Sequence, residues 1–262
     1  KRTGSSREAS QRSIDQGCDA SDDWVATVVA WLAIRVAQMR RMRRFSSWRV
    51  ALESGSLRST RMTPVGRFGP IVNDLSLYGY SVSEGLLTPE HIAALAAVAL
   101  THQKEGRLVR ARTGKAKTES ESVRGDSIAW LDEHSVETPA LDCNATFDAL
   151  RRTLNEQLFM NLHDVESHFA IYPPGAVYQK HLDQFATGHQ SRQLSLVLYL
   201  NEGWISTNGG ELRLYLDGSE GGQIDISPIA ARLVLFESSR FWHEVLPSNR
   251  ERLSLTGWFR TR

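Results

Sequence analysis

The stretch "ESHFAIYPPGAVYQKHLDQ", residues 166–184, lies where the hydrophobic period of the chain changes to two. From about Val165 onward apolar and polar residues alternate, which is the pattern of β-strands with one buried face. Five similar runs follow, separated by Gly, Asn, Pro and Ser turns: "RQLSLVLYLN" (192–201), "GELRLYL" (210–216), "GQIDIS" (222–227), "ARLVLFE" (231–237) and "RLSLTGWFR" (252–260). Many short strands with turns between them are typical of an antiparallel sandwich or jelly roll.

The region before these strands is predicted to be helical and mixed. "TPEHIAALAAVALTHQKEG" (88–106) is an amphipathic helix, with Thr88 as N-cap and Gly106 as terminator, and "TPALDCNATFDALRRTLNEQLF" (138–159) is a second. The polar segment 106–126 between them is expected to be a mobile loop. We therefore predict a mainly β fold with flanking α-helices: a double-stranded β-helix, or jelly roll, with the N-terminal helices packed on one face.

The charge distribution divides the chain in two. Residues 1–61 hold 12 Lys and Arg against 6 Asp and Glu, which gives +6, so residues 62–262 carry −5 of the total of +1. We expect residues 1–61 to be a disordered or non-native N-terminal extension, in which the pattern allows a helix over 22–44, and Met62 to be the natural start. Residues 62–262 are expected to form the folded domain, with its jelly-roll core at about 165–262.

Composition limits the classes of partner and compartment. A mildly acidic main domain is not the footprint of a nucleic-acid-binding protein. The apolar run 24–34 is too short to span a bilayer, so no stable membrane association is expected. Two cysteines, Cys18 and Cys143, are too few for a disulfide framework, which favours a reducing, cytoplasmic location.

Three residues are candidate metal ligands. His181 and Asp183 are two apart where a glycine-containing turn becomes extended, so their side chains share a face. His243 follows the strand 231–237, and a jelly roll places sequence-distant strands side by side. Two imidazoles and one carboxylate with three open positions form the facial triad of non-haem Fe(II) oxygenases. Glu244 would point to the opposite face and is not expected to be a ligand.

A second group of residues predicts a carboxylate-binding end of the same site. Arg252 opens the last strand, and its planar guanidinium suits bidentate pairing with a carboxylate. Ser254 shares its face, and Ser195 and Tyr199 share the inward face of the strand 192–201, whose leucines face the other way. A ligand that chelates a metal at one end and offers a carboxylate to Arg252 at the other is 2-oxoglutarate.

Several separated motifs over residues 68–260 make the chain resemble the 2-oxoglutarate/Fe(II)-dependent dioxygenases. It is most similar to the prolyl 4-hydroxylase branch, and within it to the hypoxia-inducible-factor type prolyl hydroxylases and their bacterial relatives. The motifs are "VRGDSIAWLDE" (123–133), "YPPGAVYQKHLD" (172–183), "RQLSLVLYLNEGW" (192–204), "GGELRLY" (209–215), "FWHEVLP" (241–247) and "RLSLTGWF" (252–259). "YPPG" departs from the usual Tyr-Pro-Gly spacing of the family.

The resemblance implies roles for individual residues. His181, Asp183 and His243 would bind Fe(II), and Arg252 and Tyr199 would hold the distal carboxylate of 2-oxoglutarate, with Ser195, Ser254 and Tyr172 nearby. The residues that match positions around the substrate are Arg124, Asp126, Tyr178, Arg192 and Trp258. The remaining histidines of this region, His163, His168 and His189, are expected to be structural or at the surface, and Trp130 is expected in the core.

The activity implied is hydroxylation of an unactivated C–H, at C4 of a prolyl residue in a protein or peptide, with release of succinate and CO2. Fe(II), 2-oxoglutarate and O2 would be required, and the family's use of ascorbate is implied as well. One alternative is a hydroxylase of a free amino acid or small metabolite. Another is a non-catalytic, cupin-like metal-binding module, which would have no need of Arg252 together with Tyr199.

Overall fold

The structure is a computed structural model, which describes residues 66–111, 123–131, 137–184, 192–216 and 222–262. The expected extension 1–61, with the helix over 22–44, and most of the expected loop 106–126 lie outside these residues. Eleven strands, three α-helices and two short 3-10 helices are described. In the described part of the chain, no helix is both long and apolar enough to cross a membrane.

The strands form two antiparallel sheets. The larger has seven strands in the order β1-β9-β6-β11-β4-β3-β2, and the smaller has four in the order β5-β10-β7-β8. The strands of the large sheet are β1 (Tyr80–Ser83), β2 (Val109–Arg110), β3 (Ser127–Leu131), β4 (Asp164–Tyr172), β6 (Arg192–Tyr199), β9 (Leu233–Glu237) and β11 (Arg252–Arg260). Those of the small sheet are β5 (Tyr178–His181), β7 (Leu212–Tyr215), β8 (Gln223–Ile226) and β10 (His243–Val245).

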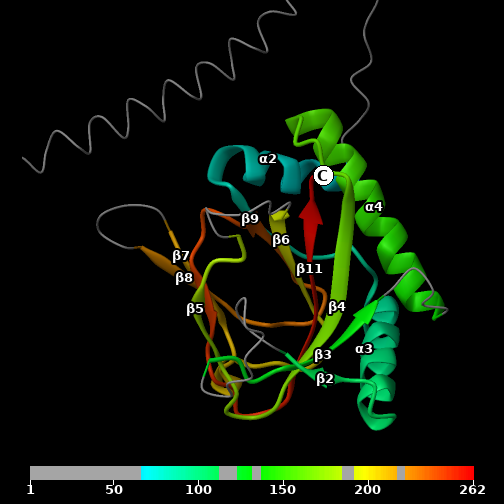
Figure 1. Cartoon of the computed structure of the whole chain (residues 1–262), viewed down its shortest axis with the longest axis vertical. Coiled ribbons are helices and arrows are strands. Elements are labelled where there is room, and N and C mark those ends of the chain that lie inside the picture. Colours follow the sequence, from blue (N-terminus) through cyan, green and yellow to red (C-terminus); the bar gives the residue numbers. More distant parts are fainter. Residues whose placement is uncertain (1–65, 112–122, 132–136, 185–191, 217–221) are drawn as a thin grey trace, which may run out of the picture. The chain divides into compact units, whose positions relative to one another are not determined.

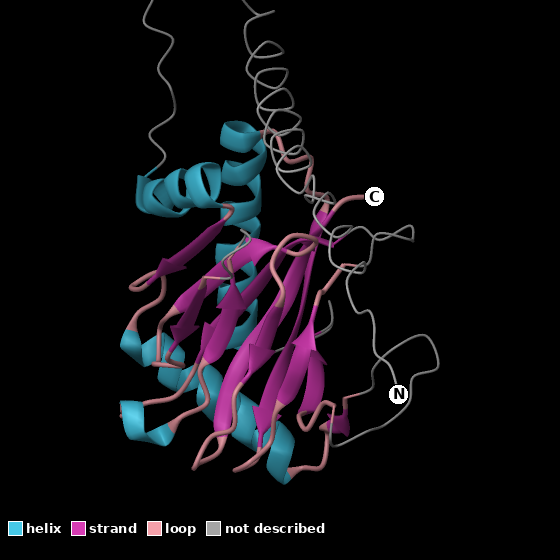
Figure 2. Cartoon of the chain, turned by 90° about the vertical axis from the view of Figure 1, so that its left-hand side faces the viewer, coloured by secondary structure: helices cyan, strands magenta, loops and turns pink. Residues whose placement is uncertain are grey.

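The helices cover the outer face of the large sheet, as Figures 1 and 2 show from two sides. They are α2 (Gly69–Tyr78), α3 (Pro89–Lys104) and α4 (Thr138–Leu158), with η1 (Gly66–Phe68) before α2 and η2 (Ser206–Asn208) between β6 and β7. Helix α3 begins as predicted, because the Thr88 side chain accepts a hydrogen bond from the backbone N–H of His91. The arrangement confirms the predicted jelly roll with its helices on one face.

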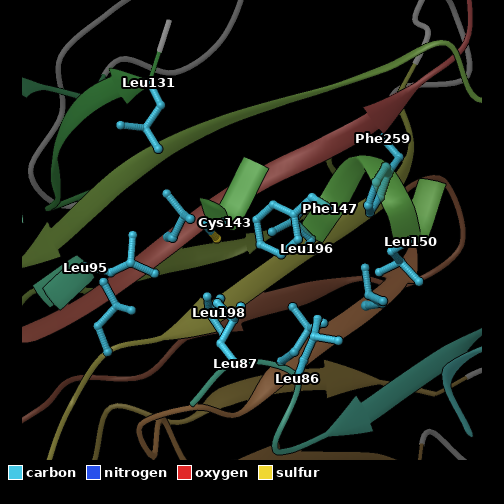
Figure 3. Packing of buried hydrophobic residues seen from close by; sticks show 14 of the residues in the cluster. Leu86, Leu87, Leu95, Leu131, Cys143, Phe147, Leu150, Leu196, Leu198 and Phe259 are labelled. Atoms are coloured by element: carbon cyan, nitrogen blue, oxygen red, sulfur yellow. The ribbon is translucent and has the colours of Figure 1, made fainter. Parts of the chain in front are cut away.

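Two hydrophobic clusters lie on the two sides of the large sheet. The outer cluster joins the helices to the sheet, and Figure 3 shows Cys143, Phe147 and Leu150 of α4 packed with Leu196 and Leu198 of β6. The inner cluster lies between the sheets and includes residues of β6 with the opposite parity, Val197 and Tyr199. Strand β6 therefore separates its side chains by parity, as its sequence predicts.

The register of β11 orders the inner face of the large sheet. On β11, Arg252 pairs with Tyr172 of β4 and Thr256 pairs with His168 of β4. On the other side of β11, Ser254 pairs with Tyr199 and Trp258 with Ser195, both of β6. Alternate residues of these strands thus form a continuous wall, which begins at Arg252 and ends at Trp258.

Candidate active site

The structure brings His181, Asp183 and His243 together between the two sheets. His181 and His243 are paired residues of neighbouring strands, β5 and β10. Both histidine Nε2 atoms lie 3.6 Å from the Asp183 carboxylate, His181 from Oδ1 and His243 from Oδ2. One potential ligand atom from each of the three residues lies within 4.8 Å of the other two. Three side chains that converge on one point in this way could hold a divalent metal ion.

Hydrogen bonds at the far side of each imidazole fix which nitrogen faces this point. The Nδ1 atom of His181 lies 2.7 Å from the carbonyl oxygen of Gln179, and that of His243 lies 3.1 Å from the carbonyl oxygen of Phe241. A carbonyl can only accept, so each Nδ1 carries a proton, and in the neutral ring the lone pair is on Nε2. A backbone carbonyl behind a ligating histidine is a common supporting contact in metal sites.

The surroundings of the three side chains set their charge. Burial alone would raise the pKa of Asp183, but the imidazoles of His243 and His181 and the Ser195 hydroxyl hold it well below its usual range. Ser195 Oγ donates to Asp183 Oδ2 at 2.6 Å and lies 2.9 Å from Ser238 Oγ. Burial lowers the pKa of His243 to about 4. A carboxylate and a neutral imidazole are the forms that bind metal.

Arg252 lies at one end of the same cavity and is 2% exposed. Its Nε donates to the carbonyl oxygen of Gly210 at 2.9 Å, and its guanidinium carbon lies 5.2 Å from the ring centre of Tyr172 and 5.0 Å from that of Tyr199. Among the described residues it has no ion-pair partner. Tyr199 is fully buried, and its hydroxyl has no hydrogen-bond partner in the same part of the chain.

These two groups test whether the implied co-substrate fits. A buried cation without an anionic partner and a buried hydroxyl without a hydrogen-bond partner are costly unless a ligand completes them. An anion such as a carboxylate would satisfy both. A histidine pair with one carboxylate is also the donor set of non-haem Fe(II) sites. The residues present therefore fit both Fe(II) and a ligand with a carboxylate at its far end.

The remaining predicted residues are placed as follows. Tyr172, Tyr178, Arg124, Asp126 and Trp258 line the cavity with the metal-binding cluster. Arg192 stacks on Trp258, with its guanidinium carbon 3.5 Å from the ring centre. Ser254 is buried, and its Oγ lies 3.3 Å from Thr256 Oγ1.

Arg124 and Asp126 form one compact unit at the cavity wall. The guanidinium donates twice to the carboxylate, at 2.7 and 2.9 Å, and also lies 4.6 Å from the Tyr178 ring. The Tyr178 ring in turn stacks on His181 with ring centres 3.6 Å apart. This chain of contacts links the segment before β3 to His181, a candidate metal ligand.

Glu244 lies where the sequence predicts, away from the cluster. It accepts a hydrogen bond from the Tyr215 hydroxyl at 2.6 Å. His163 is at the surface, as expected, with 44% of its side chain exposed. His189 lies outside the described residues.

One expectation was wrong. Trp130 is not in the core but is 47% exposed, because its strand β3 pairs on one side with only the two-residue β2. His168, which was expected to be structural or at the surface, is buried, with 1% exposed, and it also lines the cavity. The period of two could have found it, because His168 and Tyr172 are four apart on β4 and share a face.

Comparison with known proteins gives consistent matches. Residues 167–260 match the 2OG-Fe(II) oxygenase superfamily. A prolyl-4-hydroxylase of Pseudomonas putida, known from a crystal structure, is 44% identical, with 73% of this chain and 97% of that chain covered and a TM-score of 0.66. A prolyl hydroxylase from Trichoplax adhaerens, solved in complex with a hypoxia inducible factor oxygen degradation domain peptide fragment, is 27% identical, with 73% and 87% covered and a TM-score of 0.66.

Curated relatives extend the same result. The hypoxia-inducible factor prolyl hydroxylase of Caenorhabditis elegans is 28% identical over 201 residues, which are 72% of this chain and 27% of that protein. Further relatives are covered to 46% and 65% of their length. The chain thus spans between about a quarter and two thirds of the curated relatives it matches.

Proposed function

This chain belongs to the 2-oxoglutarate/Fe(II)-dependent oxygenases of the prolyl hydroxylase type, and on that premise we propose that it hydroxylates C4 of a prolyl residue in a protein or peptide. The balanced reaction converts the prolyl C–H, 2-oxoglutarate and O2 into the prolyl C–OH, succinate and CO2. One oxygen atom of O2 enters the hydroxyl group, and the other enters the new carboxylate of succinate.

In this proposal His181, Asp183 and His243 hold Fe(II). When bound, the iron would supply the reaction with O2 that side chains alone cannot perform. The protein's part is to keep the three ligands ready: two backbone carbonyls fix the histidine orientation, and the Ser195 hydroxyl holds the carboxylate. Ordered supporting contacts of this kind raise metal affinity.

The observation that carries the proposal is the buried guanidinium of Arg252, which has no anionic partner among the described residues. We infer that it pairs with the distal carboxylate of 2-oxoglutarate and that the Tyr199 hydroxyl donates to the same group. Tyr172 packs on the guanidinium from the other side, and Ser254 shares the face of Arg252. A protein that only stored metal would have no use for this cation.

We infer that the substrate enters the same cavity. Tyr178, Trp258 and the Arg124–Asp126 pair line the cavity, and Arg192 stacks on Trp258. Aromatic and arginine side chains are the groups that most often anchor a polypeptide. Use of ascorbate and a cytoplasmic location remain predictions from the sequence.

The test is oxygen incorporation under labelled O2. The full chain, supplied with Fe(II), 2-oxoglutarate and a set of short synthetic peptides with a central proline, is expected to add one labelled oxygen to proline, detected by mass spectrometry. Asp183→Ala is expected to add none, and Asp225→Ala, at an exposed ion pair with Arg213, should match the parent. Labelled succinate without any oxidised peptide, together with oxidation of a free amino acid, would contradict the prolyl proposal and favour the small-molecule alternative.

A further inference from the structure

His168 is a polar residue that neither the metal cluster nor the carboxylate end employs. It lies on β4, is 1% exposed and lines the cavity. Neither Nδ1 nor Nε2 has a hydrogen-bond partner among the described residues. Buried polar atoms in proteins are nearly always paired, so a side chain with two unpaired nitrogens in a binding cavity requires an explanation.

The neighbours of His168 hold the ring but offer it no hydrogen bond. Its ring centre lies 4.7 Å from that of Trp130 and 5.5 Å from that of Trp258. Burial lowers its pKa to about 3, with the nearby guanidinium groups of Arg124 and Arg192 acting in the same direction. The imidazole is therefore neutral and offers one N–H donor and one acceptor nitrogen.

A second unpaired donor lies beside His168, in the part of the structure formed by His168, Trp130 and Trp258, which we call the His168 corner. Trp258 is 5% exposed, and its indole Nε1–H also has no partner within the described ranges. Two buried donors beside one another match a carbonyl oxygen, which has two lone pairs. A proline has no backbone N–H, so carbonyl oxygens are the main polar groups that the chain around it offers.

The position of His168 places this corner on the substrate side. The co-substrate's carboxylate is expected beside Arg252, which pairs with Tyr172, whereas His168 lies four residues before Tyr172 on β4 and Trp258 lies six residues after Arg252 on β11, at the other end of the same wall. Trp130 of β3 is 47% exposed, so the corner continues to the surface there. Aromatic surfaces are also the usual docking sites of proline-containing segments.

We propose that His168 is a specificity-determining residue whose imidazole N–H donates to a backbone carbonyl oxygen of the prolyl substrate, beside the indole N–H of Trp258. The inference rests on the proposed function and adds to it a polar contact by which the cavity would bind the backbone of a prolyl substrate. The rings of Trp130 and Trp258 both lie against the imidazole ring and restrict its orientation.

The experiment measures peptide binding without turnover. The full chain is loaded with Zn(II), which has no redox chemistry, together with 2-oxoglutarate. Fluorescently labelled synthetic peptides with a central proline are titrated, and the tightest binder is used to compare variants by anisotropy. His168→Phe removes both polar atoms, His168→Gln and His168→Asn restore a donor, and His163→Phe at the surface is the matched control.

His168→Phe is expected to weaken peptide binding about tenfold, the size of one lost hydrogen bond. His168→Gln and His168→Asn should recover most of that affinity, and the control His163→Phe should bind the peptide as tightly as the parent does. Changing the proline's carbonyl to a thioamide, a weaker acceptor, should weaken binding to the parent protein more than to His168→Phe. Thermal unfolding of each variant identifies any that does not fold.

Equal peptide affinity of the folded Phe variant and the parent would overturn the inference and leave the proposed function standing. Equal weakening by Phe, Gln and Asn, with no difference between the amide and thioamide peptides, would also overturn it, because ring shape alone would then matter. If the parent binds no peptide but converts 2-oxoglutarate in air, the prolyl proposal fails together with the inference. These outcomes separate the two claims.

Discussion

Replacement of Arg252 by Met tests the carboxylate end of the site most sharply, because two measured quantities should move in opposite directions. The guanidinium is buried, donates to the Gly210 carbonyl and lies beside the rings of Tyr172 and Tyr199, and among the described residues it has no anionic partner. In the ligand-free protein this is an uncompensated charge. Removal of such a charge is expected to leave the free energy of unfolding unchanged or to raise it by about 1 kcal/mol.

In the presence of 2-oxoglutarate, the same Arg252→Met substitution is expected to be unfavourable, because the bound carboxylate loses its partner. Loss of one partner from a buried ion pair costs about 3–5 kcal/mol, which corresponds to a rise in the Kd for 2-oxoglutarate by a factor of about a hundred to a few thousand. Arg252→Lys keeps the charge but not the planar fork, so we expect a loss of about tenfold. Arg250→Met is the matched control, since Arg250 is exposed two residues earlier.

The assay is calorimetric titration of 2-oxoglutarate into the Zn(II)-loaded protein, combined with urea unfolding of the ligand-free protein. Unchanged 2-oxoglutarate affinity in Arg252→Met would refute the assignment of the carboxylate site. A loss of several kcal/mol of unfolding free energy without ligand would refute the premise, because the guanidinium would then be satisfied within the protein itself.

Three further predictions concern the metal cluster and the fold. Ser195→Ala removes the hydrogen bond to Asp183 and should lower metal affinity about tenfold, measured by competition with a chromophoric chelator; unchanged affinity would contradict it. Gly257→Ala should lower the free energy of unfolding, measured in urea, by about 2–3 kcal/mol, because a Cβ at this position collides with the Glu166 carbonyl oxygen of β4. An unfolding free energy equal to that of the parent would contradict this prediction. Burial raises the pKa of Cys143 to about 12, so little thiolate is present from pH 7 to 10. Iodoacetamide should therefore label Cys143 only after denaturation. Labelling of Cys143 in the native protein that increases through pH 8–9 would contradict this prediction.

The fold was predictable from local patterns where these were strong. Helices α3 and α4 have helical periodicity and clear first-turn residues, and their observed bounds lie within two residues of the predicted ones. Strands β6 and β11 are eight and nine residues long, and side chains of different kinds alternate along their sequences. In contrast, β10 has three residues and an irregular register with β5. Such short segments carry no periodicity, so their pairing was not deducible from the sequence alone.

The candidate site was predictable in part. The parity of β6 and β11 placed Ser195, Tyr199 and Arg252 on the inner face, and the structure agrees. The convergence of His181 with His243 depends on the pairing of β5 with β10. The predicted jelly roll allowed this pairing, and the family resemblance implied the same three ligands. The position of His168 in the cavity wall was not predicted because it belongs to no motif, although its parity with Tyr172 indicated the inner face.

The most direct test of the account is succinate production by the full chain, loaded anaerobically with Fe(II) and then given 2-oxoglutarate and air. We expect slow turnover without a peptide and faster turnover with an accepted proline-containing peptide. Asp183→Ala and Arg252→Met should both abolish it, the first through the metal and the second through the co-substrate. Absence of 2-oxoglutarate binding in the parent protein, despite tight Fe(II) binding, would contradict the account and favour a metal-binding module.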